Sequence, residues 1–375
     1  MSPLNLLMLS GDSSVAQAGD EGVFNTMLRR FSTYWERIDI LCPRAPGTAE
    51  RQRFGNVYVH PSPYHRALQP IYIWRKGREL LAQRPYALIV SHDFGLFYNG
   101  IGALLLNRPY VSEIHHVEGY PCAVTAREQL SRRAAQFYIS VARRRAAAFR
   151  AVNPVEIPDL LRKWGVPDDK ILVLPSLYID FTCFHPMDVP RRFDVAFVGR
   201  FAPNKGLFTL IEAVAQVKMT HPTIRIGLLG RGTLEAALRD RIAALGLREQ
   251  VTLITERVPT DAVARFYNQS GMLVCASTSE GGPRVTVEAM ACGVPVISTR
   301  VGIMPELIRD GENGLLFDGS AEQLALRIRR LLDDEALRET IGNAGRAAVQ
   351  GFTADTVIAG YAEGYQALIR RMTHA

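Results

Sequence analysis

The amino-acid sequence predicts an α/β protein made of two successive Rossmann-like, doubly wound domains that face each other across a cleft. Its 375 residues fit two domains, since a domain typically has about 100–200 residues. Short apolar runs alternate with helical patterns, which is typical of parallel sheets covered by helices. This alternation stops in a Pro-containing stretch at 176–193 and then starts again, which indicates a linker between two domains.

Residues 1–180 are expected to form the first domain. Its strand-like runs are apolar and mostly end in polar residues; they lie at 4–10, 38–43, 56–61, 87–93, 110–116 and 171–176. A loop at 11–22 follows the first run, and a helical pattern begins at Val23. Ligands bind beside the carboxyl ends of such strands, so we expect the site there.

Residues 190–352 are expected to form the second domain, with the boundary near 178–192. Strand-like runs lie at 194–200, 224–230, 251–254, 272–277, 295–299 and 314–317. Helices are expected to start near Leu207, Thr233, Thr260, Pro283 and Ala321. Two doubly wound units in one chain place the default ligand site in the cleft between them.

The composition is that of a globular protein. Apolar residues make up 47% of the chain and charged residues 22%, which excludes the disordered and collagen-like classes. We find no apolar run long enough to span a membrane and no basic N-terminal region of a signal peptide. Five scattered cysteines without a CxxC pair indicate a reduced, cytoplasmic protein without structural zinc.

The positive charge is concentrated in the first half of the chain. The net charge is +7, and the segment 127–150 alone contains seven Arg and one Glu. This segment is interpreted either as a surface helix packed by an apolar stripe, or as an interfacial helix that binds an anionic membrane. The stripe consists of Leu130, Ala134, Phe137 and Val141. Nucleic-acid binding is a third interpretation, weakened by the scarcity of interleaved aromatic residues.

A glycine-containing loop is the strongest sign of a ligand site. Gly281, Gly282 and Pro283 join a strand to a helix, and Pro283 suits the first helical position. The backbone amides of Arg284 and Val285 would then be exposed at the start of the helix, where phosphate binds well.

Charged residues accompany this loop. Glu280 and Glu288 are eight positions apart, and the alternative is that both are simply solvated. Arg200 and Lys205 lie on the loop that follows the strand ending at Gly199. A guanidinium and an ammonium together suit a diphosphate, whereas the alternative is two ordinary surface cations.

The combination resembles the family-4 retaining glycosyltransferases of the GT-B fold. The similar segments are the GR-xxxx-KG loop at 199–206, the glutamate pair followed by AMACGVPVIST, and 301–317. The resemblance implies that Arg200 and Lys205 bind the diphosphate of a nucleotide-sugar. It also implies that Glu288 holds the ribose hydroxyls and that Glu280 lies near the transferred sugar. In relatives a final helix returns to the first domain, so the same is expected of 353–375.

In the first half, VSEIHHV resembles the strand end where the family places a histidine beside the donor sugar. His115 falls on that position and His116 on one that is often Asp. Gly19 matches a glycine near the donor phosphates, although the next residue, Asp20, replaces a second glycine. Further departures are Ile303, where a glycine is usual, and Arg284, where a smaller residue is frequent.

The resemblance implies transfer of a hexose-type sugar from a nucleotide-diphosphate-sugar to an acceptor hydroxyl, with retention of configuration. The expected acceptor is a sugar, a lipid or a small molecule, in cell-envelope polysaccharide, glycolipid or glycoconjugate synthesis. No metal and no other cofactor is expected. The chain would be cytoplasmic or peripheral at the inner face of the membrane. A nucleotide-sugar epimerase of the same fold is the alternative enzyme.

Overall fold

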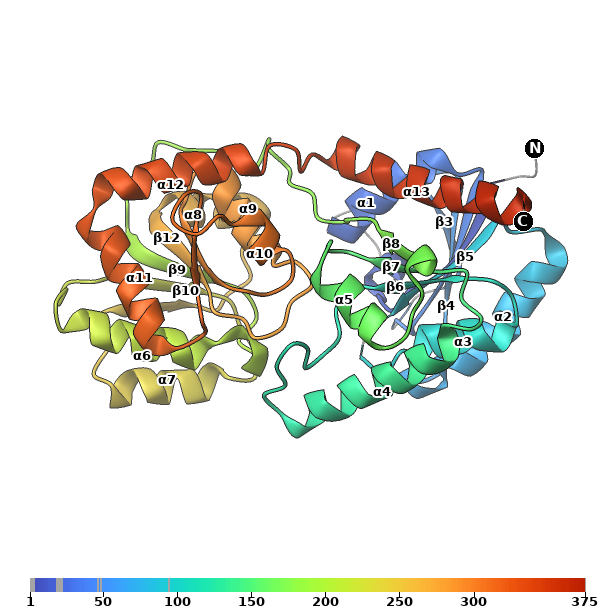
Figure 1. The fold of residues 1–375 in the computed structure, drawn as a ribbon, viewed down its shortest axis with the longest axis horizontal. Helices are drawn as coiled ribbons and strands as arrows, with labels where there is room; N and C mark the ends of the chain where they lie inside the picture. Colours follow the sequence, from blue (N-terminus) through green and yellow to red (C-terminus); the bar gives the residue numbers. More distant parts are fainter. Residues whose placement is uncertain (1–3, 18–22, 46, 48, 94, 375) are drawn as a thin grey trace. The chain divides into compact units, whose positions relative to one another are not determined.

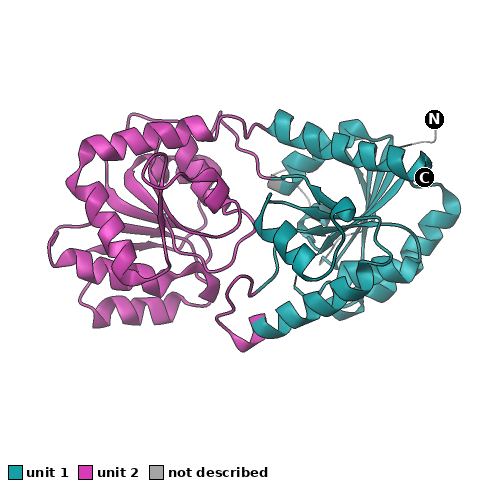
Figure 2. Cartoon of the chain, viewed as in Figure 1, with its two compact units in different colours: residues 1–118, 129–176, 354–375 teal, residues 119–128, 177–353 magenta. Residues whose placement is uncertain are grey.

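Two compact units make up the chain in a computed structural model that describes residues 4–17, 23–45, 47, 49–93 and 95–374. Unit 1 comprises 1–118, 129–176 and 354–375, and unit 2 comprises 119–128 and 177–353 (Figure 2). This division differs from the sequence-based one chiefly in assigning 119–128 to unit 2.

Unit 1 is built on an eight-stranded sheet of order β3-β4-β2-β1-β5-β6-β7-β8. All neighbouring strands are parallel except β3 and β4, which are antiparallel. The strands are β1 (Asn5–Leu9), β2 (Arg37–Cys42), β3 (Arg51–Arg53), β4 (Val57–Pro61), β5 (Leu88–Asp93), β6 (Val111–Ile114), β7 (Ala148–Ala151) and β8 (Ile171–Val173). The chain order reverses between β1 and β5, so loops diverge there and leave room for a ligand.

Helices cover both faces of this sheet. They are α1 (Val23–Phe31), α2 (Gln69–Gln83), α3 (Tyr98–Leu106), α4 (Ala126–Ala142), α5 (Glu156–Lys163) and α13 (Ala354–His374). The C-terminal helix α13 lies beside α1 on one face, and α2, α3 and α4 lie on the other (Figure 1). Tyr361 and Tyr365 of α13 are buried against the sheet.

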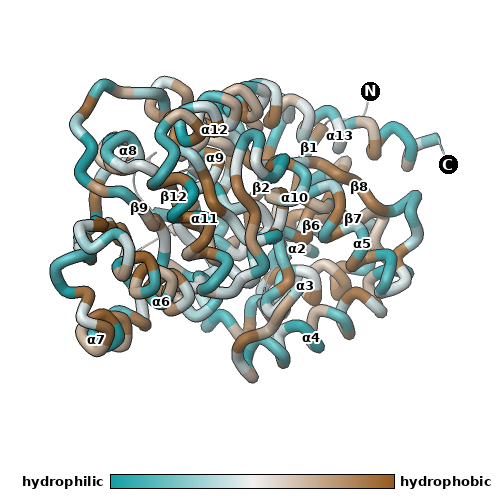
Figure 3. The backbone as a smooth tube through the Cα atoms, turned by 60° about the vertical axis from the view of Figure 1, so that its left-hand side comes forward, coloured by the Kyte–Doolittle hydropathy of each residue, from teal (hydrophilic) through white to brown (hydrophobic). Residues whose placement is uncertain are grey.

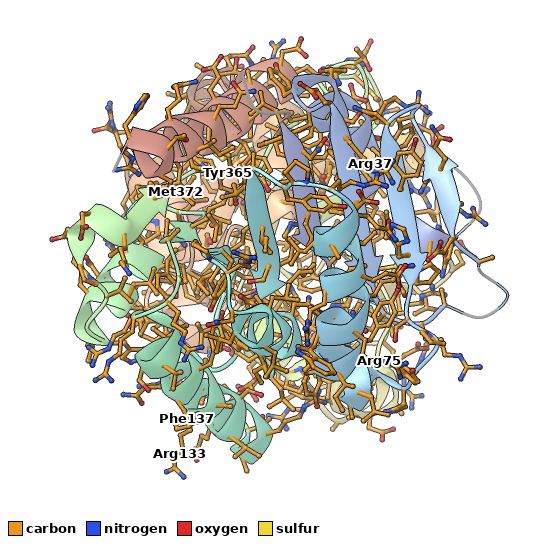
Figure 4. All side chains as sticks on the ribbon, turned by 90° about the vertical axis from the view of Figure 1, so that its right-hand side faces the viewer. Arg37, Arg75, Arg133, Phe137, Tyr365 and Met372 are labelled. Atoms are coloured by element: carbon orange, nitrogen blue, oxygen red, sulfur yellow. The ribbon has the colours of Figure 1, made fainter. Side chains whose placement is uncertain are left out.

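The sequence suggested that the basic segment 127–150 is one helix, but the structure divides it. Helix α4 ends at Ala142, and Arg150 lies in β7 with 1% of its surface exposed. The apolar stripe does not pack against the protein, as one of the two interpretations required, because Leu130 and Phe137 are 63% and 73% exposed. Phe137 and Arg133 project outward from α4 in Figure 4. The helix instead packs through mainly smaller residues, namely Ser131, Ala135, Tyr138, Ile139 and Ala142.

Unit 2 contains a six-stranded parallel sheet of order β11-β10-β9-β12-β13-β14. Its strands are β9 (Phe193–Val198), β10 (Ile226–Leu229), β11 (Val251–Ile254), β12 (Ser270–Cys275), β13 (Val296–Thr299) and β14 (Leu315–Phe317). Its helices are α6 (Leu207–Lys218), α7 (Glu235–Ala244), α8 (Thr260–Asn268), α9 (Arg284–Ala291), α10 (Met304–Leu307), α11 (Ala321–Asp333) and α12 (Glu335–Ala348). Here the order reverses between β9 and β12.

Apolar side chains cover both faces of the sheet in unit 2. In unit 2, Val195 belongs to an apolar layer on one face of β9 and Ala196 to a layer on the other. Apolar residues follow the strands, and polar residues gather in loops and helix surfaces (Figure 3). Within the described ranges, no helix combines the length and apolar character needed to cross a membrane. The two Rossmann-like units predicted from the sequence are therefore confirmed.

Candidate active site

Two loops meet at the point in unit 2 where the strand order reverses. One follows β9 and carries Arg200 and Lys205, and the other follows β12 and carries Glu280. The Asn204 side chain donates to the carbonyl of Ser279 at 3.1 Å. Gly206 packs so closely that an added Cβ would approach the carbonyl oxygen of Ala276 to 2.0 Å. The fold therefore brings the two predicted charged loops together.

Lys205 and Glu280 form the central ion pair of these loops. The Lys205 ammonium contacts Oε1 of Glu280, and Ser277 donates to the same oxygen at 3.0 Å. Both charged side chains are 17% exposed, so part of each remains open to solvent. Arg200 is exposed on the same loop. Cationic groups at such a loop can bind an anionic ligand that competes with the carboxylate.

Helix α9 begins beside this pair. Pro283 is the residue before the helix rather than its first residue, and α9 has no side-chain cap among the described residues. The loop at Gly281 is packed against Gly302, where an added Cβ would lie 2.5 Å from the Gly281 carbonyl oxygen. Uncapped amides at a helix start favour an anion.

Arg284, the first residue of α9, contacts the beginning of the 177–353 segment of unit 2. Its guanidinium donates to the carbonyl of Tyr178 at 2.5 Å and lies over the Tyr178 ring, 5.1 Å from the ring centroid. The unusual arginine thus has a local role, since it fastens residues 177–178 to α9.

Glu288 lies one turn further along α9 and is 8% exposed. Tyr267 of α8 donates to its Oε2 at 3.1 Å. Burial raises the pKa of Glu288 to about 7, although the charge of Arg284 and the Tyr267 hydroxyl both lower it. A carboxyl group with this pKa changes its charge near neutral pH.

In unit 1, a buried carboxylate occupies the same sheet as the predicted histidine. Glu113 of β6 is in register with His92 of β5 and with Arg150 of β7. These three side chains therefore lie side by side on one face of the sheet. Nε2 of His92 is 2.9 Å from Oε2 of Glu113, and Nη1 of Arg150 donates to Oε1 at 2.9 Å.

Helix α13 completes the surroundings of Glu113. Tyr361 and Tyr365 are four residues apart on one face of α13, and both hydroxyls donate to Oε1 of Glu113. Burial alone would raise the pKa of Glu113, but the charges of His92 and Arg150 hold it well below its usual value. Glu113 is therefore a fixed negative charge in the interior of unit 1.

His115 extends this cluster beyond the end of β6. It lies two residues after Glu113, on the same face, with its Nε2 3.4 Å from Oε2 of Glu113. Its ring stacks edge-on against His92, with the centroids 5.7 Å apart. Burial lowers the pKa of His115 more than Glu113 raises it, so the ring is neutral at pH 7. His115 thus contacts Glu113.

Sequence reasoning missed most of this cluster. His92, Glu113, Arg150 and the two tyrosines were not proposed as site residues, although Glu113 precedes His115 by the two positions that place strand residues on one face. Gly19, the other first-half candidate, lies outside the described residues. In the described part of the chain, no group of three or more His, Cys, Asp or Glu residues could hold a metal ion.

Two family models match this chain. The "Glycosyl transferase 4-like domain" matches residues 35–176, and "Glycosyl transferases group 1" matches residues 189–348. Each model covers the greater part of one unit.

Curated relatives agree with the models over part of the chain. The D-inositol 3-phosphate glycosyltransferase of Acidothermus cellulolyticus is 34% identical over 253 residues, which is 61% of this chain and 56% of the relative. The protein of that name from Arthrobacter sp. (strain FB24) is 32% identical over 236 residues, covering 58% and 55%. The chain spans about half the length of these relatives.

Solved structures show the same fold over the whole chain. Sucrose-phosphate synthase from Thermosynechococcus elongatus superposes with a TM-score of 0.80 at 21% identity, covering 98% of this chain and 100% of that one. Anabaena HepE in complex with UDP-glucose gives a TM-score of 0.74 at 21% identity, covering 99% and 100%. With these GT-B neighbours and both family models, the chain belongs to the family-4-type glycosyltransferases of the GT-B fold.

Proposed function

We propose that this protein transfers a hexose-type sugar from a nucleotide-diphosphate-sugar to an acceptor hydroxyl, with retention of configuration. The observation that carries this proposal is the meeting of the β9 and β12 loops, where Lys205 and Glu280 pair at the strand-order reversal of unit 2. The Anabaena HepE structure is a complex with UDP-glucose, which supports a nucleotide-sugar donor for this protein.

The leaving diphosphate determines what the loops must do. Negative charge grows on the diphosphate oxygen as the bond to the anomeric carbon breaks. Arg200, Lys205 and the amides of Arg284 and Val285 would stabilise that charge, and such preorganised donors are each worth roughly 10²–10³ in rate. The exchange of Glu280 for a phosphate as the partner of Lys205 would free the carboxylate to bind a sugar hydroxyl. In this proposal the protein needs no metal or other cofactor.

The other residues have separate roles. Glu288 would accept hydrogen bonds from the ribose hydroxyls, and Gly281 and Gly282 would let the backbone approach the donor. His115 of unit 1 would hydrogen-bond the transferred sugar. The acceptor would attack on the side that the diphosphate leaves, which explains retention without a covalent sugar–enzyme intermediate.

A peripheral membrane location is part of the proposal. Helix α4 exposes apolar side chains together with arginines, a combination that binds anionic lipid surfaces. The exposed residues of α4 and of the turn after it include Arg127, Leu130, Arg133, Phe137, Val141 and Arg144. This location fits a role in cell-envelope polysaccharide or glycolipid synthesis at the inner face of the membrane.

Flotation with anionic vesicles tests the α4 surface. Phe137→Asp should abolish flotation, whereas Leu326→Asp, at a residue 52% exposed on α11, should not change it. Equal flotation of both variants would refute a membrane role for α4. A gel-shift assay with nucleic acid over a salt series covers the remaining interpretation of these arginines.

A donor screen tests the activity. Release of nucleoside diphosphate from one member of a nucleotide-sugar panel, with the sugar recovered on an acceptor, supports transfer. Recovery of an isomerised sugar nucleotide supports the epimerase alternative, and no turnover with any donor argues against both.

The Lys205→Ala variant tests the assigned donor site. Loss of a charge-assisted hydrogen bond should weaken nucleoside diphosphate binding by about 1.5–3 kcal/mol in calorimetry. Lys218→Ala removes an equal charge at the far end of α6 and serves as the control. Unchanged affinity in Lys205→Ala would refute the assignment.

A further inference from the structure

A pocket opens in unit 1 at the carboxyl ends of β1, β2 and β4, on one side of the order reversal between β1 and β5. Its volume is about 330 Å³, and its lining residues are Gly11, Ser13, Pro43, Arg44, His65 and Arg66. These residues come from the loops after β1, β2 and β4. This is the place where a doubly wound sheet is expected to bind a ligand.

A smaller recess adjoins the pocket and reaches toward the histidine cluster. The two share Gly11, Pro43 and Arg66, and the recess adds Gln69, His92, Tyr98 and Asn99. His92 contacts both Glu113 and the ring of His115. A molecule in this pocket would therefore lie close to the histidine that we assign to the transferred sugar.

The lining of the main pocket is cationic. Arg44 and Arg66 supply guanidinium groups that suit a phosphate or a carboxylate. Nδ1 of His65 accepts a hydrogen bond from the amide of Ala67 at 3.3 Å, which leaves the ring proton on Nε2 as a donor. Among the described residues that line the pocket and the recess, none is acidic.

Gln69 gives a second and independent sign of a ligand. It is the first residue of α2, and only 1% of its surface is exposed. Neither its Nε2 nor its Oε1 has a hydrogen-bond partner among the described residues. A buried amide without partners is costly, and a ligand hydroxyl can both donate to Oε1 and accept from Nε2.

We infer that this pocket is the acceptor site and that it selects an anionic polyol, a hydroxylated ring or chain that bears a phosphate or a carboxylate. Arg44, His65 and Arg66 bind the anionic group, and Gln69 binds a hydroxyl beside His92. This inference rests on the proposed glycosyl transfer, because it names the acceptor class for that reaction.

The experiment compares matched pairs of probes on the full-length protein. The pairs are inositol with inositol 3-phosphate, and glucose with glucose 6-phosphate, measured by calorimetry in the presence of saturating UDP. The phosphorylated member of at least one pair should bind tenfold or more tightly than its parent, since charged hydrogen bonds add about this much. Equal affinity within both pairs would overturn the inference.

Variants locate the binding. Arg44→Ala and Arg66→Ala should each reduce the preference for the phosphorylated member several-fold, and the double variant should abolish it. Gln69→Leu should weaken both members of a pair. Arg78→Ala removes an exposed charge further along α2 and should change nothing. A preference that survives in the double arginine variant would show that the anion binds elsewhere.

Two further arms separate the sources of failure. Glycerophosphoinositol carries the phosphodiester of a lipid head group. Tighter binding of it than of inositol 3-phosphate identifies the acceptor as a lipid, and the reverse identifies it as a free metabolite.

Acceptor-independent hydrolysis of the nucleotide-sugar is measured on the same preparation. Hydrolysis without any preference for phosphorylated probes rejects the acceptor class but leaves glycosyl transfer standing. A preference without UDP binding or hydrolysis rejects the donor reaction, and the acceptor assignment with it.

Discussion

Two buried carboxyl groups, one in each unit, differ in how the protein treats their charge. Glu113 in unit 1 is surrounded by Arg150, His92 and two tyrosine hydroxyls, and its pKa is held well below the usual value. Glu288 in unit 2 receives a hydrogen bond from Tyr267, and burial raises its pKa to about 7. Unit 1 thus stabilises a permanent charge, whereas unit 2 keeps a carboxyl group whose ionisation a ligand can favour.

This difference distinguishes a carboxylate that positions neighbouring side chains from one that can bind a ligand. Glu113 has its partners within unit 1, so its role is to fix the positions of His92 and His115. In the proposed function, Glu288 gains hydrogen bonds from the ribose hydroxyls of the donor. The two groups should therefore respond in opposite ways to mutation and to ligand.

Glu113→Ala should have the largest effect on stability. It leaves the Arg150 guanidinium buried without its counter-charge, and loss of one partner of a buried pair costs about 3–5 kcal/mol. Denaturant unfolding measures this loss. Glu79→Ala removes an exposed carboxylate of α2 and should change stability by less than about 0.5 kcal/mol. Similar losses in the two variants would contradict the special status of Glu113.

Glu288 should make nucleotide binding depend on pH. Its carboxylate form accepts hydroxyl hydrogen bonds, so affinity for a nucleoside diphosphate should rise by up to about tenfold as pH increases through 7. Glu288→Gln should flatten this rise in calorimetry across pH 6–8, a range of about one pH unit on either side of that pKa. If affinity rises equally with pH in the wild type and the variant, titratable groups other than Glu288 cause the rise.

The same raised pKa predicts how stability changes with pH. The folded state binds the Glu288 proton more tightly than the unfolded state, whose pKa is near 4.5. The stabilisation by this proton is therefore complete below pH 4.5 and is lost as pH rises through about 7. Thermal unfolding of the wild type should lose this contribution over that range, and Glu288→Gln should not.

The tyrosines of α13 should have a smaller effect on stability than Glu113, whose carboxylate they bind. Tyr361→Phe and Tyr365→Phe each remove one hydrogen bond to the ionised Glu113, which should cost about 1.5–3 kcal/mol. Because both hydroxyls bind the same oxygen, the double variant should depart from the sum of the single losses. Strict additivity in denaturant unfolding would show that the two bonds are independent.

The sequence predicted what is local and missed what is assembled over distance. All strands except β3 and β7 were found because each is a short apolar run. The loops at 199–206 and 279–283 were found because their charged residues are close in sequence. The Glu113 cluster joins residues from four separate elements, β5, β6, β7 and α13. No local sequence pattern predicts contacts between such distant residues. The spacing of Glu113 and His115, however, indicates that these two side chains share one face of the strand.

Helix α4 shows a second limit of sequence reasoning. One of its two interpretations required the apolar stripe to face the core, yet the buried side contains small residues such as Ser131 and Ala135. Small side chains let the helix pack closely on its neighbours, and Tyr138 inserts to donate to Oγ of Ser112 at 3.1 Å. Hydrophobicity alone therefore selected the wrong face. Strand β7 was missed because Arg150 interrupts its short apolar run.

The central claim is that unit 2 binds the nucleotide while His115 of unit 1 acts on the transferred sugar. The most direct test measures turnover and nucleoside diphosphate affinity on one preparation of His115→Ala, with His116→Ala as the matched control. The account predicts that His115→Ala loses most of its turnover and keeps nearly unchanged affinity, whereas His116→Ala keeps both. Near-normal turnover of His115→Ala, or a parallel loss of nucleotide affinity, would contradict it.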